Sequence, residues 1–311
     1  MRRARARHPR RTWPALGLAL ALAASQAAAQ ELEPRALINA PIGVNFLIAA
    51  AGYAYGNVLI DPSLPLDDFR ARVGSLALGY QRIVDVFGMV GRIGAVVPTA
   101  SGRWEATLSG IDTATNRTGF GDPTVKFAVN FVGSPALTMS EFRDYRQATV
   151  VGAQVAVTAP LGQYDPDRLV NLGTNRWTIA PRLGASQVFG RRWVLEGYAS
   201  VSFYTANAEY FGGGRLTQAP FFDTQAHLIY AIRGTDFWAA ASVGYGWGGR
   251  TTADGVPGDA ITNVRLSGVL RYPLARGHSL KLAYINGFRT EVGADYDTIQ
   301  LVYTHAWGGK P

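Results

Sequence analysis

The chain has 311 residues, of which 48% are hydrophobic and 17% charged, and it contains no cysteine. The lack of cysteine excludes disulfides, thiolate metal sites and cysteine catalysis. The formal net charge is +8, but six arginines lie within residues 2–11, so the basic excess belongs mainly to the N-terminus and does not indicate nucleic-acid binding.

The N-terminus has the three parts of a secretory signal peptide. The six arginines come first without an acidic residue, an apolar stretch follows at 13–24, and a run of alanines ends at Ala29. This order of basic, apolar and small residues is typical of exported proteins. We therefore predict a signal peptide at 1–29, cleaved after Ala29, and a short periplasmic N-terminal segment at 30–42.

The remaining sequence alternates apolar and polar residues as β-strands do. Apolar side chains occupy every second position in 237–247, and polar or charged residues oppose apolar ones in 122–132, 193–204 and 263–272. Alternate residues of a strand face opposite sides of a sheet. We find about twelve such segments of roughly ten to thirteen residues, long enough to cross a bilayer when tilted and longer than typical soluble strands.

The connections between these segments alternate in length. Four short turns alternate almost strictly with six longer connections, of which 98–121 is the longest. Outer-membrane barrels have short periplasmic turns and longer external loops. The connection 133–147 is the exception, because its place in the order is periplasmic although it is long, and we expect a short helix at 139–146.

These patterns predict an all-β fold, namely a transmembrane antiparallel up-and-down β-barrel of about 12 strands. The barrel would occupy 43–307 and leave a C-terminal tail at 308–311. No run of eighteen apolar residues follows the leader, so we expect no transmembrane helix. Aromatic residues near both strand ends, such as Trp177, Phe221 and Trp193, indicate two interfacial girdles. The phase of the first three strands stays open.

The sequence offers no catalytic or metal motif after the leader. Neither Gly-x-Ser-x-Gly nor His-Glu-x-x-His occurs, and we expect no enzyme activity, no cofactor and no metal site. His227 shares a predicted strand face with Asp223, but residues four apart on one strand lie too far apart for a direct hydrogen bond. The glycine-rich run 244–249 lies within strand alternation and does not join a strand to a helix, as a dinucleotide fingerprint must.

Charged residues on the predicted strands must face a wet or internally paired lumen, because a mid-bilayer Arg or Lys costs about 2–4 kcal/mol. We predict that the lumen is lined by Lys126, Asn130, Gln154, Arg176, Arg182, Glu196, Tyr198, Asp223, Gln225, His227, Arg265, Arg271, Lys281 and Gln300. The basic excess in this set favours anionic solutes unless the charges pair and plug the lumen. Aromatic residues expected at the external mouth are Trp104, Tyr164, Tyr204, Tyr210 and Phe211.

The order of several motifs resembles a known family. Gly-Asp-Pro at 121–123 opens a strand, and Gly-Gln-Tyr-Asp at 162–165 is followed by Asn-Leu-Gly-Thr-Asn-Arg-Trp at 171–177. Over about 34–307 the chain is similar to proteobacterial proteins catalogued under the meta-pathway of phenol degradation or as outer-membrane transporters, and distantly to fatty-acid and toluene channels. The resemblance implies uptake of hydrophobic or aromatic compounds and no catalytic residues. The segment 30–42 is too short for the N-terminal hatch of those channels.

We therefore predict a porin-like channel or transporter in the outer membrane of a Gram-negative bacterium, for passive uptake of small hydrophobic compounds, aromatic ones included. Its expected partners are outer-membrane lipid, small hydrophobic solutes and the outer-membrane assembly machinery, and not nucleic acid. The alternatives are a structural or adhesive barrel that acts through its extracellular loops and a soluble periplasmic β-sandwich. The sequence leaves open the substrate, the oligomeric state and whether the lumen is open or plugged.

Overall fold

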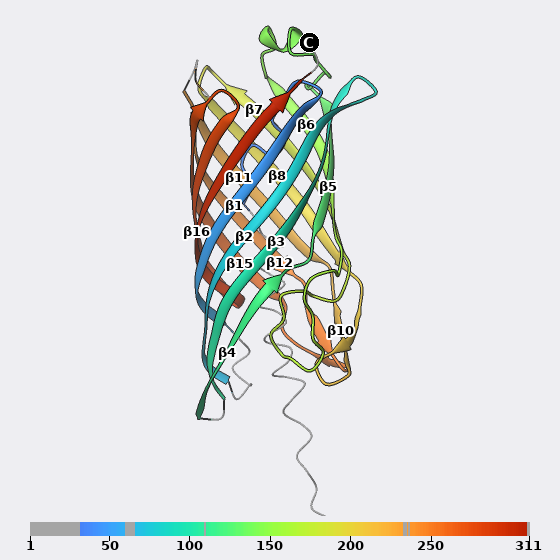
Figure 1. The fold of residues 1–311 in the computed structure, drawn as a ribbon, viewed down its shortest axis with the longest axis vertical. Coiled ribbons are helices and arrows are strands. Elements are labelled where there is room, and N and C mark those ends of the chain that lie inside the picture. Colours follow the sequence, from blue (N-terminus) through green and yellow to red (C-terminus); the bar gives the residue numbers. More distant parts are fainter. Residues whose placement is uncertain (1–31, 60–65, 109, 233–234, 236, 310–311) are drawn as a thin grey trace, which may run out of the picture.

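A computed structural model describes residues 32–59, 66–108, 110–232, 235 and 237–309, which form a tall barrel (Figure 1). The expected signal peptide and its cleavage site lie outside these residues. No helix among the described residues has the length and apolar character to cross a bilayer. The wall strands are β1 (Val44–Leu59), β2 (Leu66–Val86), β3 (Met89–Leu108), β4 (Ile111–Phe120), β5 (Thr124–Val132), β6 (Thr149–Thr158), β7 (Thr178–Phe189), β8 (Trp193–Tyr204), β11 (Phe221–Ala231), β12 (Trp238–Gly248), β15 (Ile261–Ala275) and β16 (His278–Gly308).

The wall closes on itself with twelve antiparallel strands among the described residues, which confirms the predicted barrel. β1 pairs with β16, beginning with Val44 opposite Gly308, and β2 pairs with β3. β16 crosses the wall twice, because its first half pairs with β15 and its second half with β1. β4 and β5 run along β3 as two parts of one crossing, separated by Gly-Asp-Pro at 121–123. The first strand therefore begins at the rim where the last strand ends.

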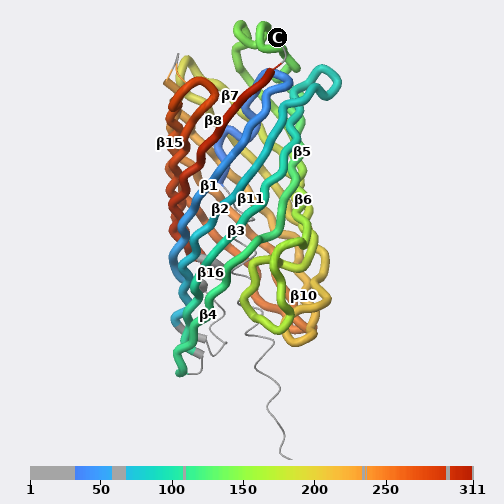
Figure 2. The backbone as a smooth tube through the Cα atoms, viewed as in Figure 1, coloured from blue at the N-terminus to red at the C-terminus, as the bar shows by residue number. Residues whose placement is uncertain are grey.

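Much of what the sequence predicts as long loops is in fact paired strand. The expectation of a loop at 98–121 is wrong, because β3 continues to Leu108 and returns as β4. Figure 2 shows this hairpin extending beyond the barrel at the end opposite the C-terminus. Two other connections form a small sheet of four strands, namely β9 (Asn207–Tyr210), β10 (Gly214–Gln218), β13 (Thr251–Ala253) and β14 (Val256–Pro257). Strand pairing satisfies the backbone N–H and C=O groups of these connections.

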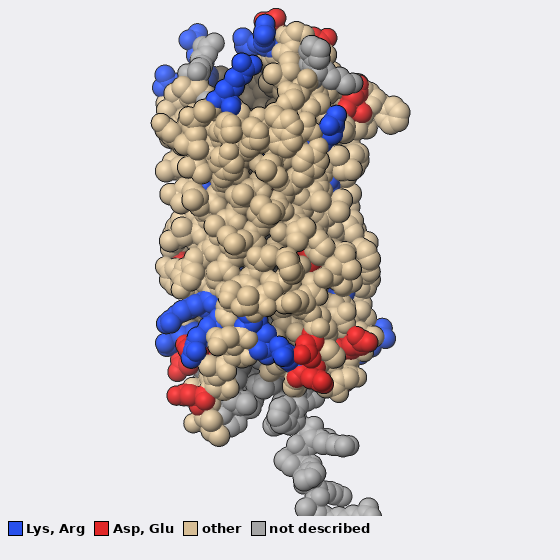
Figure 3. Space-filling model, in the orientation of Figure 1, with Lys and Arg blue, Asp and Glu red and all other residues tan. Residues whose placement is uncertain are grey.

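Side chains alternate between the barrel interior and its outer surface. Along β11, burial and exposure change at every residue from Phe221 to Ile229. Leu228, Leu270 and Leu301 face outward and are 47%, 50% and 47% exposed. Figure 3 shows charged side chains gathered at the two ends of the barrel, with a broad band of other residues between them. Many of the exposed side chains on this surface are large and hydrophobic, as a lipid-facing band requires.

Aromatic residues occur on the outer surface near both ends of this band. They are Trp177, Phe203, Tyr245 and Trp247 near the end with the longer connections, and Trp193 and Tyr272 near the end with the short turns. The assignment of Phe221 to this girdle is wrong, because Phe221 is 3% exposed and packs inside against Ile261. Phe222 takes the outward position and stacks with Trp247. We call the two ends of the barrel the loop end and the turn end.

The connection 133–147 lies at the turn end of the barrel and contacts the turn between β2 and β3. Residues Glu141–Arg143 form a single 3-10 turn, η1, where a short helix was expected. The Leu137 carbonyl oxygen accepts a hydrogen bond from the Ile42 backbone nitrogen at 2.9 Å, and Ala136 packs against the cluster around Ile42. The connection therefore holds the chain that leads into β1 against the rim of the barrel.

Candidate functional site

The interior faces of β11 and β15 carry the same bands of apolar and polar residues. β12 lies between these strands and aligns them, since Asp223 and Asn263 are both opposite Gly246. From the loop end to the turn end, the interior residues are Phe221, Asp223, Gln225, His227 and Ile229 on β11, and Ile261, Asn263, Arg265, Ser267 and Val269 on β15. The interior faces of β11 and β15 thus have an apolar band near each end and a polar band in the middle.

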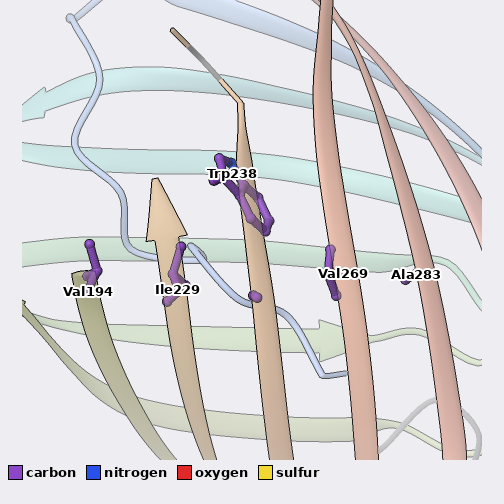
Figure 4. Close-up of a cluster of buried hydrophobic side chains, with 6 residues drawn as sticks. Val194, Ile229, Trp238, Val269 and Ala283 are labelled. Carbon is purple, nitrogen blue, oxygen red and sulfur yellow. The ribbon is translucent and has the colours of Figure 1, made fainter. Parts of the chain in front are cut away.

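The apolar band at the turn end extends over five neighbouring strands. Figure 4 shows Val194, Ile229, Trp238, Val269 and Ala283 on neighbouring strands, and together with Ala240 they form one buried cluster. The interior of a water-filled porin is polar. Pockets for small organic ligands, by contrast, are lined mainly by apolar side chains with a few polar groups. This face of the lumen is therefore suited to an apolar solute.

Residues 32–42 lie inside the barrel, which corrects the prediction of a periplasmic segment. Leu37 is 2% exposed and packs with Ala128 and Tyr198 on the interior wall. The Leu37 carbonyl oxygen accepts a hydrogen bond from Asn130 Nδ2 at 2.9 Å. Residues 32–42 therefore fill part of the lumen. We call them the inner segment.

Two charged residues of the inner segment pair with charged residues of the wall. Glu33 Oε2 lies 3.3 Å from Lys126 Nζ and 3.9 Å from Arg182 Nη1. Glu196 Oε1 lies 3.5 Å from Arg35 Nη1, and Glu196 Oε2 accepts a hydrogen bond from the Arg35 backbone nitrogen at 2.6 Å. Buried charges are costly without partners. The inner segment and the wall therefore supply each other with counter-charges.

Several buried polar atoms of the polar band have no hydrogen-bond partner within the described part of the chain. They include Nε and Nη2 of Arg265, both polar side-chain atoms of Asn263, and Oγ of Ser267. Thr290 Oγ1, whose residue lies opposite Asn263 across β15 and β16, is also without a partner. Buried polar groups are almost always hydrogen-bonded. These atoms are therefore available for hydrogen bonds to groups outside the described residues.

The interior holds no preformed metal or acid–base centre among the described residues. No group of three or more His, Asp or Glu side chains there is arranged to hold a metal ion. Neither ring nitrogen of His227 has a hydrogen-bond partner in this part of the chain, so no acid–base pair with Asp223 forms. The His227 ring instead meets the Tyr198 ring edge-on, with 5.3 Å between ring centroids.

Apart from Arg176, the residues that we assign to the lumen from the sequence lie on wall strands and face the barrel interior. Asn130, Glu196, Tyr198, Asp223, Gln225, His227 and Arg265 are buried there, and Lys126, Gln154, Arg182, Arg271, Lys281 and Gln300 are half-buried. Arg176 differs because it precedes β7, lies 4.6 Å from the centre of the Tyr204 ring and donates to the Gln218 side chain in the small sheet. That these residues line a solute path stays a prediction.

The aromatic residues expected at the external mouth do not form an open ring around it. Trp104 is buried on the interior face of β3 and packs with Phe69 and Tyr296. The other four hold loop segments together through hydrogen bonds, cation–π contact or packing: Tyr164, Tyr204, Tyr210 and Phe211. These contacts therefore order the segments at the loop end.

The interior role of Glu33, Arg35 and Leu37 is not predicted from the sequence. One signal was available, because the basic excess on the predicted interior face needs acidic partners and Glu33 lies shortly before the first strand. The buried Arg92, which donates to Asn130 at 3.3 Å, was also missed. The apolar and polar residues of its strand do not alternate clearly, so the sequence did not show which residues face the interior.

At the loop end, β4 has a strand neighbour on one edge only. Within the described residues, β4 is paired with β3, and no strand is paired with its other edge. That edge faces the connection 159–177, where Arg117 Nε donates to the Val170 carbonyl oxygen at 2.8 Å. Residues of β4 and of this connection line a shared pocket, among them Arg117, Gln163 and Arg168. The Gln163 backbone nitrogen also donates to the Phe120 carbonyl oxygen at 2.8 Å, so side-chain contacts and a single backbone hydrogen bond stand in place of a strand ladder here.

A closed antiparallel barrel with an apolar outer band and a partly polar interior defines the class of outer-membrane β-barrels. Within that class, the chain belongs to the family described as "Putative MetA-pathway of phenol degradation", which matches residues 51–302.

Two of the following solved structures, with TM-scores above 0.5, share the barrel fold. The COG4313 outer membrane channel from Pseudomonas putida F1 has a TM-score of 0.75 and 19% identity, covering 89% of this chain and all of its own (100%). The transport unit of the Escherichia coli autotransporter AIDA-I has a TM-score of 0.52 and 10% identity, covering 94% and 97%. The Pseudomonas putida toluene transporter TodX has a TM-score of 0.44 and 9% identity, covering 86% and 90%. No curated protein matches the sequence.

Proposed function

We propose that the chain is an outer-membrane channel through which small hydrophobic compounds, aromatic ones among them, enter the cell passively. The observation that carries the proposal is the apolar band at the turn end, where Ile229, Trp238 and Val269 belong to one interior cluster. A path for water-soluble solutes needs no such band. An apolar solute gains about 25 cal/mol for each Å² that leaves water.

The arrangement of the interior supports a path that begins and ends on apolar surface. At the loop end, Phe221 and Ile261 form an interior cluster against which Tyr204 packs. The polar band separates this cluster from the apolar band at the turn end. Leu37 of the inner segment packs on Tyr198, which is opposite Gln225 of the polar band. Passage therefore requires the inner segment to shift. Its contacts with the wall are side-chain contacts and single hydrogen bonds, which break more readily than a strand ladder.

The proposal includes the processing and location of the chain. A signal peptide at 1–29 is removed after Ala29, and the assembly machinery inserts the barrel at 43–307 into the outer membrane. The apolar outer band supports contact with lipid. The short inner segment supports passive transport, because energised receptors carry a plug of domain size. The residues assigned to the lumen from the sequence line the path.

Uptake measurements test the proposal. Cells with and without the gene are given labelled toluene or a labelled sugar, and we expect only toluene uptake to fall in the deletion strain. Rescue should be weaker with Ile229→Asn, which places a polar group in the apolar band. Thr224→Asn, on the outer face of the same strand, is the matched control. Equal toluene uptake in both strains, with loss of sugar or anion entry in the deletion, would establish a general or anion-selective porin instead.

One observation favours a second candidate function, an adhesive or structural barrel. The small sheet of β9, β10, β13 and β14 gives the loop end an ordered surface with its own apolar cluster around Tyr210 and Leu216. If deletion of 206–218 abolishes attachment of cells to a surface, and the intact protein gives liposomes no permeability to any small solute, this second function replaces the first.

A further inference from the structure

The polar band contains a cation for which the described chain supplies no close acceptor. Arg265 is 8% exposed, and its Nε and Nη2 atoms have no hydrogen-bond partner there. Asp223 and Asp295 act on it through space, but neither forms an ion pair with it among the described residues. Asp223 is instead bound by the side chains of Ser200 and Gln225. A buried guanidinium without an acceptor is costly, so Arg265 calls for an acceptor that the described residues do not supply.

The two unpartnered atoms define the shape of that acceptor. Nε and Nη2 lie on one edge of the guanidinium, and their N–H bonds point the same way. This edge matches a carboxylate, whose two oxygens accept two parallel hydrogen bonds. Water fills one of the two positions at a time, whereas a carboxylate fills both and also brings the opposite charge.

Two other residues near Arg265 have buried polar atoms without a hydrogen-bond partner among the described residues. Asn263, two residues toward the loop end, is 1% exposed and lacks partners for both its amide nitrogen and its oxygen among the described residues. Thr290 Oγ1 is opposite Asn263 in the register of β15 and β16. The group therefore offers a guanidinium edge, an amide and a hydroxyl to one ligand.

The neighbouring strand leaves space beside this group. Gly244 is directly opposite Arg265, and Gly246 is opposite Asn263, so β12 presents no side chain at either position. A Cβ atom on Gly244 would lie 2.7 Å from Leu32 Cδ2 of the inner segment. The recess at Gly244 is thus bordered by the apolar side chain of Leu32, beside the charged edge of Arg265.

Apolar surface lies on both sides of the polar group. Ile261 and Val269 are four residues from Arg265 in either direction on β15, roughly 13 Å along the strand. Each belongs to one of the interior apolar clusters. A plain hydrocarbon satisfies only these clusters, whereas a molecule with an anionic head and an apolar body satisfies the clusters and Arg265 together.

We propose that Arg265, with Asn263 and Thr290, binds the carboxylate of a small monocarboxylic acid whose apolar body rests on a neighbouring apolar band. The proposal rests on the proposed function and narrows its substrates from hydrophobic compounds in general to apolar acids. Aromatic acids and short fatty acids share this chemistry, and the experiment separates them.

Direct binding to the purified full-length protein in detergent tests the site. Calorimetric titration with benzoate, octanoate and acetate compares the wild type with Arg265→Gln, Arg265→Lys and the control Arg289→Gln, which alters an exposed arginine at the loop end (side chain 72% exposed). We expect saturable benzoate or octanoate binding that Arg265→Gln weakens about tenfold or more, because two charge-assisted hydrogen bonds are lost. Arg265→Lys should lie between, and Arg289→Gln should match the wild type.

Each outcome decides the proposal. Binding of benzoate alone identifies aromatic acids, and binding of octanoate alone identifies fatty acids; both support the site when Arg265→Gln removes them. Acetate binding as tight as benzoate, or benzoate binding unchanged by Arg265→Gln, overturns it. The mobility shift on heating in SDS confirms that each variant is folded. Toluene uptake in cells separates this result from the proposed function: the site stands if Arg265→Gln lowers benzoate binding even where toluene uptake proves independent of the gene.

Discussion

The outer and inner faces of the same strands follow different rules. On β15 the outward residues Leu266, Leu270 and Tyr272 are all apolar or aromatic and exposed, while the inward face passes from apolar to polar and back to apolar. The outer face meets a single solvent, lipid, which disfavours polar groups throughout its hydrocarbon depth. The inner face carries apolar bands, a polar band and contacts with the inner segment at different heights. The outer face is therefore largely apolar along its length, whereas the residue type on the inner face depends on height in the barrel.

The largest expected difference between the faces is the cost of a charge. Leu301 faces outward and is 47% exposed, and its neighbour Gln300 faces inward. We expect Leu301→Arg to lower the free energy of unfolding by about 2–4 kcal/mol, because the guanidinium enters hydrocarbon. Gln300→Arg should leave it nearly unchanged. Denaturant titration of both variants in lipid vesicles measures the difference, and equal losses would contradict the assignment of the two faces.

The second prediction concerns the contact between the inner segment and the wall. Glu196 is 1% exposed and accepts hydrogen bonds from the backbone of Arg35 and from the hydroxyls of Ser186 and Tyr198. Glu196→Gln removes the counter-charge of Arg35, at a cost of about 1–3 kcal/mol. We expect the inner segment to leave the wall more often, so that ion conductance in planar bilayers rises severalfold. Gln300→Glu, a charge change on the interior face of β16, controls for a general effect of charge; unchanged conductance in Glu196→Gln would mean that the inner segment does not limit conductance.

A smaller effect should follow pH. Burial disfavours ionised Glu33, but Lys126, Arg182 and Lys281 together outweigh it and lower the pKa of Glu33 to about 2. A carboxylate with a lowered pKa in the docked state stabilises docking fully above its ordinary pKa of about 4.5 and loses this contribution as the pH falls toward 2. We therefore expect conductance to rise as the pH falls below about 4.5. Glu33→Gln should abolish this rise, and a rise of equal size in that variant would assign it to another group.

The smallest predicted effect belongs to the outer face near the turn end. Trp193 and Tyr230 meet edge-on with 5.0 Å between ring centroids. Trp193→Leu keeps an apolar side chain and loses the ring contact, which should cost about 0.5–1.5 kcal/mol. Phe189→Leu, at the position directly opposite Trp193, is the control. If the two variants unfold at the same denaturant concentration, the ring pair contributes nothing.

The strands were predictable where lipid constrains the sequence. In 237–247 every second residue is apolar, because each such residue faces hydrocarbon, and β12 follows this segment closely. The hairpin of β3 and β4 was not predicted, because its residues beyond about Pro98 lie where no lipid selects apolar side chains. Backbone hydrogen bonds between the neighbouring strands β3 and β4 determine the structure there. The amino-acid composition of this segment gives little sign of that pairing.

The interior was predictable by face and not by contact. Alternation places Lys126, Arg182 and Glu196 on the inner face, as the structure has them. Their partners Glu33 and Arg35 precede the first strand, and Glu33 is 93 residues away from Lys126 in sequence. A single sequence carries no signal for which charges meet across such a distance. The polar band itself needs the register of β11, β12 and β15, which alternation alone does not set.

The pairing of β1 with the second half of β16 sets the order of events in assembly. The ladder that joins them runs from Val44 opposite Gly308, so it forms only after nearly the whole chain has been delivered. Until then β1 and the newest strand each expose an unpaired edge, which invites pairing with other chains. Contacts between the two ends of a chain also form slowly, because a long loop must close first. A chain truncated before residue 293 would lack every partner residue of β1 in this ladder, so it would remain an open, aggregation-prone sheet.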